Sequence, residues 1–158
     1  MEFVNFGHES IMCFNNDDNS FSYIKADRPP LGLLHIKDSS TIKTSKINLK
    51  NKKMFIYTDG VTEGYIDGEQ EFTVKGVEKD ILKNSSLTIK EIIDSIVNKL
   101  NNRDNLRDDI TIMGLQWLKK LSYSLFDKSF FWFSSSSSII FNRAEDITLV
   151  FFSNLSKS

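Results

Sequence analysis

Two stretches of the sequence decide the fold: MFIYTDGVTE at residues 54–63 and DDITIMGLQW at residues 108–117. Each contains an apolar run suited to a strand that is buried on both faces. In the first stretch Asp59 follows the apolar run, and in the second Asp108 and Asp109 precede it. If the two strands pair antiparallel, the end of one lies beside the start of the other. The carboxylates of Asp59 and Asp108 could then meet at one edge of the sheet.

Carboxylates gathered at one edge repel one another unless a cation lies between them. Oxygen ligands suit hard divalent ions such as Mg²⁺ or Mn²⁺, and the sequence offers no grouped His and Cys residues for zinc. Each signal also has an ordinary explanation. Asp59 and Gly60 after a strand are typical of a hairpin turn, and paired aspartates before a strand are typical of a solvated loop. The residues alone leave both explanations open.

The sequence before residue 54 predicts short strands separated by turns. Polar residues 15–20 are typical of a solvated hairpin turn, since they lack the glycine and the distal glutamate of a calcium-binding loop. The predicted strands form an antiparallel meander followed by one further short strand: Phe3–Phe6, Ile11–Phe14, Phe21–Ile24 and Lys46–Leu49.

The sequence between the two stretches predicts helices. The apolar residues Val74, Val77, Ile81 and Leu82 recur at helical spacing. A second and clearer pattern runs from residue 89 to residue 100, and Thr88 with Glu91 forms a capping box at its start. A meander, two helices and a closing strand indicate an α+β fold with helices packed on an antiparallel sheet.

Composition limits the class of protein. The chain has 158 residues, 20 Lys+Arg against 21 Asp+Glu, a formal net charge of -1 and 40% hydrophobic residues. A chain of this length can bury a core without disulfides or a structural metal. The charge balance disfavours a nucleic-acid binder, and no apolar stretch reaches the roughly 20 residues of a membrane span. A single cysteine, Cys13, is expected to be a buried free thiol, which suits a cytoplasmic protein.

The chain divides by composition into residues 1–118 and residues 119–158. The second part contains seven of the 13 phenylalanines and a run of serines at 134–138, so it is expected to be a tail of uncertain order. Within it, AEDITLV at residues 144–150 echoes DDITIM at residues 108–113. This echo makes Asp146 a weak candidate for a further carboxylate of the same kind.

Four motifs, in order, carry a resemblance to a known family. The family strings Asn-Ala-Gly-His and Pro-Leu-Gly-Ile/Leu are similar to NFGH and PLGL here, and YTDGVTE and DDIT match without change. Gly68, Glu69 and Phe72 also fit, whereas Thr73 replaces the usual glycine. From residue 2 to about residue 117 the chain resembles the C-terminal half of a SpoIIE-type (RsbU-like) domain, within the PPM or type 2C metal-dependent serine/threonine protein phosphatases. The four motifs lie at residues 5–8, 30–33, 57–63 and 108–111.

The resemblance implies an αββα sandwich, incomplete here, with two ions of Mn²⁺ or Mg²⁺ at one edge. It makes Asp59 and Asp108 the metal ligands, which act through metal-bound water that attacks phosphorus. Asp109 is either a further ligand or a support for its loop. Gly60, Gly7, His8 and Gly32 are implied to support the site, His8 as a proton donor or a turn residue and Gly32 through a turn conformation open only to glycine.

Intact domains of the family begin upstream with a segment that carries a third metal carboxylate, so the domain is expected to be truncated, with an apolar sheet face exposed. The resemblance implies a phosphoserine/phosphothreonine protein phosphatase in bacterial partner-switching signalling, with a phosphorylated anti-sigma-factor antagonist as substrate. The alternative is a non-catalytic fragment or interaction module, which binds a signalling partner or completes its fold as an oligomer or with another chain. Neither reading involves nucleic acid or a membrane.

Overall fold

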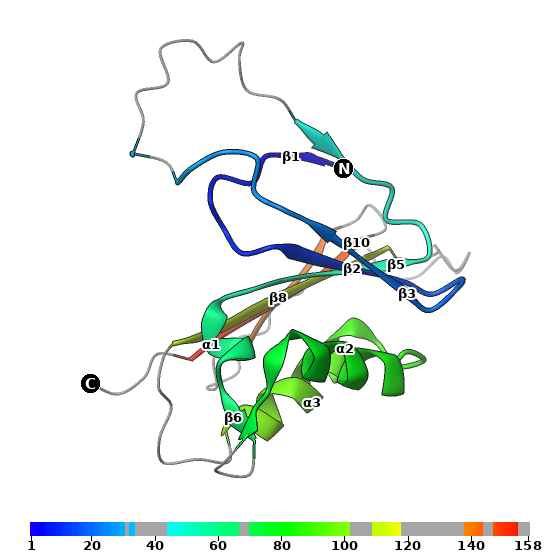
Figure 1. The fold of residues 1–158 in the computed structure, drawn as a ribbon. Coiled ribbons are helices and arrows are strands. Elements are labelled where there is room, and N and C mark those ends of the chain that lie inside the picture. The colour runs from blue at the N-terminus through cyan, green and yellow to red at the C-terminus, as the bar shows by residue number, and fades with distance from the viewer. Residues whose placement is uncertain are drawn as a thin grey trace.

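The computed structural model describes residues 1–30, 32–33, 44–66, 70–101 and 109–117, and the strands at 138–143 and 147–154. Its central feature is a six-stranded antiparallel sheet with helices on one face (Figure 1). The α+β prediction is therefore confirmed, and the fold is compatible with part of a PPM-type sandwich. The strands, in spatial order, are β3 (Ser20–Ile24), β2 (Ile11–Asn15), β5 (Lys52–Tyr57), β8 (Ile110–Trp117), β10 (Ile147–Asn154) and β9 (Ser138–Arg143).

The two stretches that predicted the fold form the central pair of strands. β5 and β8 run antiparallel, with Tyr57 opposite Ile112 and Met54 opposite Leu115. β2 and β3 form the predicted hairpin around the polar turn. The predicted meander is wrong in its first segment, because β1 (Glu2–Phe3) pairs with β4 (Ser45–Lys46) in a separate two-stranded sheet.

The helices α2 (Thr73–Lys83) and α3 (Ile89–Asn101) pack on one face of the sheet. The predicted capping box is present at α3, where the Thr88 hydroxyl donates to Glu91 Oε2 (2.8 Å) and accepts from the Glu91 amide (3.3 Å). Gly114 lets α3 come close to β8, since a Cβ on it would lie 2.7 Å from Ile89 and 2.8 Å from Ile93. A residue larger than glycine would therefore push α3 away from the sheet.

The apolar spacing in α2 predicted a wider buried face than the structure shows. Val77 and Ile81 are fully buried, but Val74 is 39% exposed and Leu82 is 45% exposed. One side of α2 turns toward α3, where Lys99 forms an ion pair with the mostly buried Asp80. The buried stripe of the helix is narrow as a result, and it leaves two apolar side chains at the surface.

The other face of the sheet carries a smaller apolar cluster around Cys13, Met54 and Leu115. Phe3 of β1 and Ile47, directly after β4, pack against this cluster and cover part of the face that was expected to be exposed. Cys13 is a buried free thiol, as predicted, and burial raises its pKa. No helix in the described ranges is long and apolar enough to cross a membrane.

Strands β9 and β10 come from the segment whose order the sequence left uncertain. β10 pairs with β8 along its whole length, from Ile147 opposite Trp117 to Asn154 opposite Ile110. Asp146 lies outside the described residues, but Ile147 directly after it lies at the end of β8 that is far from Asp109. This register argues against Asp146 as a third carboxylate beside Asp59.

Candidate active site

Thr58 joins the end of β5 to the start of β8. Its amide donates to the carbonyl of Thr111 (3.0 Å), and the Thr111 amide donates to Thr58 Oγ1 (3.0 Å). The Thr58 hydroxyl also donates to the carbonyl of Asp109 (3.1 Å). These bonds continue the antiparallel pairing of β5 and β8 by one residue beyond Tyr57. The backbone of Asp59, the next residue, therefore lies close to the start of β8, where Asp109 is. Sequence reasoning did not identify this role, and its one signal is a hydroxyl residue between a buried strand and an aspartate.

Asp59 begins a short helical turn, α1 (Asp59–Thr62), and not the hairpin turn that an Asp-Gly pair usually forms. Its side chain is exposed, and its Oδ1 accepts a hydrogen bond from the amide of Gly60 (2.9 Å). Gly60 and Val61 are buried beneath it. The carboxylate is therefore oriented by the adjacent backbone and presented to solvent at the end of β5.

The structure brings Asp59 and Asp109 to neighbouring strand ends. Asp109 is half-buried and precedes β8, while Asp108, the other predicted ligand, lies outside the described residues. Within the described part of the chain, no group of three or more His, Cys, Asp and Glu side chains could hold a metal ion. Two carboxylates on adjacent strand ends nevertheless match the oxygen donors that Mn²⁺ and Mg²⁺ prefer.

The first motif forms a tight loop around a buried asparagine. Asn5 Oδ1 accepts from the amide of His8 (2.9 Å), and Asn5 Nδ2 donates to the carbonyls of His8 and Glu9 (both 3.3 Å). His8 itself is exposed, with its Nδ1 3.3 Å from the carbonyl of Glu9. The sequence indicated Asn5 only as part of a motif, but its side chain makes the hydrogen bonds that hold this loop together.

The second motif packs against the first. Gly7 has φ +70°, and a Cβ there would overlap the ring of Pro30. Phe6 also pairs with Arg28 in an isolated bridge. Gly32 has φ +94° with open space around it, so it adopts the glycine turn conformation that the sequence predicted. Both glycines have conformations that other residues rarely adopt, but only Gly7 is also confined by a neighbour.

A tyrosine and glutamate cluster connects this loop to the end of β5. Burial raises the pKa of the Tyr57 phenol, and the nearby carboxylates of Glu9 and Glu78 raise it further. Tyr23 donates a hydrogen bond to Glu78 (2.5 Å), and burial with this bond raises its pKa as well. The loop that follows the first motif therefore lies near Tyr57, two residues before Asp59.

A cavity of about 420 Å³ lies at the opposite end of the central strands, and no acidic residue lines it. It is separated from Asp59 by the length of β5, so it is not the predicted metal site. The lining residues are Asn16, Asn48, Lys50, Asn51, Lys52, Gln116 and Trp117.

Comparison with known families gives a match over most of the chain. The family model of stage II sporulation protein E (SpoIIE) matches residues 1–118, a range that contains all four motifs and the Thr58 junction. A search of curated proteins and a search of solved structures each find no match. The matched family indicates a PPM-type phosphatase domain, and phosphatases of this type are generally metal-dependent. The chain belongs to the SpoIIE family.

Proposed function

We propose that the domain is a metal-dependent phosphoserine/phosphothreonine protein phosphatase of bacterial partner-switching signalling. Its proposed substrate is a phosphorylated anti-sigma-factor antagonist. The observation that supports this proposal is the Thr58 junction, because it brings Asp59 and Asp109 to adjacent strand ends inside the SpoIIE match.

Each residue at the junction has a proposed role. Asp59 and Asp108 hold Mn²⁺ or Mg²⁺, with Asp109 as a further ligand or a support for its loop. The bound ions supply an activated water and positive charge for the phosphate oxygens. Thr58 fixes the separation of the two strand ends, and the Gly60 amide orients the Asp59 carboxylate through its hydrogen bond to Oδ1. The loop of Gly7 and His8 packs against Pro30, which lies two residues before Gly32, and together these residues support this edge of the sheet.

The test is hydrolysis of a phosphoserine peptide by the purified chain in Mn²⁺. Asp59→Asn and Asp108→Asn are expected to lower turnover by about 100-fold or more, since even outer-shell partners of a metal contribute about 10- to 100-fold. A chelator should abolish turnover. Asp94→Asn, which removes a half-exposed carboxylate on α3 that pairs with Lys90, is the matched control and should leave turnover unchanged. Equal turnover in the Asp59→Asn and Asp94→Asn variants would contradict the proposal.

Thr58 can be tested separately as a positioning residue. Thr58→Val keeps the shape of the side chain but removes the hydroxyl that bonds Asp109, and Thr58→Ser keeps the hydroxyl. We expect Thr58→Val to require more Mn²⁺ for half-maximal turnover and Thr58→Ser to restore the wild-type requirement. A purely structural role would lower the folded fraction without shifting the Mn²⁺ dependence.

A non-catalytic interaction module is the second candidate. It is favoured by Ile56 and Met113, which are only half-buried on the face of the sheet opposite the helices. Such a module would complete its fold as an oligomer or with another chain. A folded sample without turnover that forms a stable oligomer in sedimentation would support this candidate over the enzyme.

A further inference from the structure

The outer side of α2 combines exposed apolar side chains with the edge of the sheet. Tyr23, Val74 and Leu82 are 38%, 39% and 45% exposed, and they are three of the seven large hydrophobic side chains exposed in the described residues. Val74 and Leu82 flank Glu78 on α2, and Glu78 accepts the hydrogen bond from Tyr23 on the edge strand β3. One apolar strip therefore continues from β3 onto α2.

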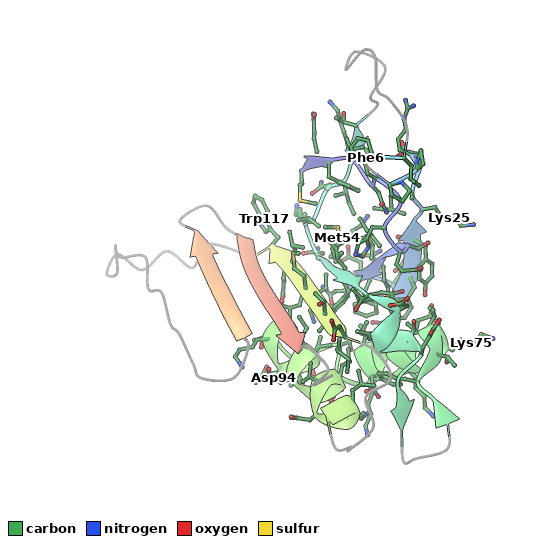
Figure 2. The ribbon with its side chains drawn as sticks, turned by 90° about the vertical axis from the view of Figure 1, so that its left-hand side faces the viewer. Phe6, Lys25, Met54, Lys75, Asp94 and Trp117 are labelled. Atoms are coloured by element: carbon green, nitrogen blue, oxygen red, sulfur yellow. The ribbon has the colours of Figure 1, made fainter. Side chains whose placement is uncertain are left out.

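A row of lysines runs beside this strip. Lys75, Lys79 and Lys83 recur every four residues, so they lie on one side of α2, and all three are exposed. Figure 2 shows Lys75 pointing away from the body of the domain. Three other lysines of the described residues have acidic partners: Lys46 pairs with Glu2, Lys90 with Asp94, and Lys99 with Asp80.

No ion pair joins the three lysines of the row to any residue in the described ranges. Like charges four residues apart destabilise a helix, so within this chain the row lowers the stability of α2. Two acidic residues lie between the lysines in sequence: Glu78 accepts a hydrogen bond from Tyr23, and the mostly buried Asp80 pairs with Lys99. The positive charge of the row is therefore available to a partner.

From this arrangement we infer that the outer side of α2 is a docking surface for an acidic amphipathic segment of another polypeptide. We call it the α2 surface, and it consists of Tyr23, Val74, Leu82, Lys75, Lys79 and Lys83. Acidic side chains of the partner would neutralise the lysine row, and its apolar side chains would cover Val74 and Leu82. Charge complementarity of this kind selects the partner and accelerates its association.

The α2 surface is connected to the segment that carries Asp59. The amide of Phe72, directly before α2, donates to the carbonyl of Gly64 (2.6 Å), two residues after α1 ends. Glu78 also lies close enough to Tyr57 to raise its pKa. A polypeptide held on α2 would thus lie on the side of the domain where the candidate active site is. The inference does not depend on catalysis, because it concerns binding alone.

The experiment measures binding of the full chain to a fluorescein-labelled amphipathic helical peptide. Its Leu side chains lie on one face of the helix and its Glu side chains on the other. A second peptide with Gln in place of every Glu serves as the charge control. We expect the acidic peptide to bind and the Gln peptide to bind at least about tenfold more weakly. Raising the salt from about 0.05 M to about 0.5 M should also weaken the acidic complex, since screening shortens the range of the attraction.

Two sets of charge reversals test the location. Reversal of the row (Lys75→Glu, Lys79→Glu, Lys83→Glu) is expected to weaken binding at least about tenfold. A matched set at exposed lysines elsewhere (Lys25→Glu, Lys46→Glu, Lys50→Glu) changes the net charge equally and should leave binding within about twofold. Val74→Ser with Leu82→Ser should also weaken binding, and circular dichroism shows whether each variant is folded.

Three results would overturn the inference. The first is that both sets of reversals weaken binding equally. The second is that the Glu and Gln peptides bind equally well, and the third is that a folded wild-type chain does not bind the acidic peptide. Vesicles containing phosphatidylserine form a separate arm. If they bind the row and the acidic peptide does not, the surface recognises anionic lipid and the polypeptide inference is wrong.

Discussion

The two faces of the sheet differ in how completely they are covered. Among the residues whose burial the structure describes, 16 form one core with α2 and α3 on the helical face, whereas five form a cluster on the opposite face. The same strand serves both faces, since Phe55 points into the large core and Met54 into the small one. The comparison indicates that the helical face supplies most of the stability, while the opposite side holds the loops of the first two motifs.

Truncation of neighbouring residues on β5 should give the largest difference between the faces. Phe55 and Met54 are 0% and 1% exposed, so burial alone does not distinguish them. Phe55→Ala is expected to lower the free energy of unfolding by about 3 to 5 kcal/mol, because the large core cannot collapse around the cavity. Met54→Ala should lower it by about 2 kcal/mol, because the smaller cluster can relax. Urea unfolding followed by circular dichroism measures both.

The difference in stability between Phe55→Ala and Met54→Ala could come from the two faces or from the two residue types. Two variants on β8 separate these causes. Leu115→Ala removes a side chain from the small cluster, and Ile112→Ala removes one of similar volume from the large core. Ile112→Ala should destabilise more. If the two losses are equal, the two faces contribute alike and the comparison fails.

The loops on the opposite side give the next prediction, through two glycines with positive φ. Gly7→Ala is expected to lower the free energy of unfolding by about 2 to 4 kcal/mol, because left-handed strain is added to an overlap with Pro30. Gly32→Ala has the strain without the overlap and should cost about 1 kcal/mol. The same urea titration reports both values. A larger loss for Gly32→Ala would show that the packing of the two motif loops contributes little.

The sequence predicted the features that depend on local pattern. The apolar runs of β5 and β8 need only their own residues to indicate central strands, and the capping box of Thr88 and Glu91 specifies the start of α3 locally. The sequence also indicated that these two strands pair, because two strands that are both buried on both faces lie in the centre of the sheet and have few other possible neighbours.

The features that the sequence missed depend on neighbours far along the chain. Val74 and Leu82 fit a helical period, but whether they are buried is set by how β3 and α3 flank α2. Thr58 stands between a buried strand and an aspartate in the sequence, but its positioning role appears only once Asp109 and Thr111 lie beside it. For the candidate site, the sequence identified the acidic residues but not the hydrogen bonds that position them.

A buried lysine on the helical face was also not anticipated, and it supplies the third prediction. Lys53 is 2% exposed, and its amine donates to the carbonyls of Ser85 (2.5 Å) and Leu87 (2.8 Å) in the α2–α3 connection. Lys53→Met leaves these carbonyls without their donor and should lower the free energy of unfolding by about 1 to 3 kcal/mol. Lys52→Met, on the neighbouring half-buried position, should change it by less than about 0.5 kcal/mol.

The pH dependence of Lys53 sharpens this prediction. Burial lowers its pKa below the unfolded value of 10.5, so above the folded pKa the unfolded chain binds more protons than the folded one. The contribution of Lys53 to the free energy of unfolding therefore rises as the pH approaches 10.5. The difference between wild type and Lys53→Met should grow from about pH 8 to about pH 10. A difference that shrinks over this range would show that the amine is not desolvated.

The smallest expected effect is at Thr73, the position where the resemblance to SpoIIE domains fails by one residue. Thr73 has φ +55°, a left-handed conformation that costs a β-branched residue about 1 to 2 kcal/mol, so the glycine usual in the family suits the backbone better. Its hydroxyl accepts a hydrogen bond from the Gly76 amide (3.3 Å), which caps α2. Asparagine tolerates this conformation and also caps helices.

Thr73→Asn should therefore raise the free energy of unfolding by about 1 kcal/mol, and the Tm by about 3 °C, as measured by a thermal melt. Thr73→Ala keeps the strain and removes the capping oxygen, so it should be less stable than wild type by about 1 kcal/mol. Thr73→Gly relieves the strain but also removes the cap, so it should fall between the two variants. An order in which Thr73→Ala is the most stable would show that the start of α2 adopts a different backbone conformation.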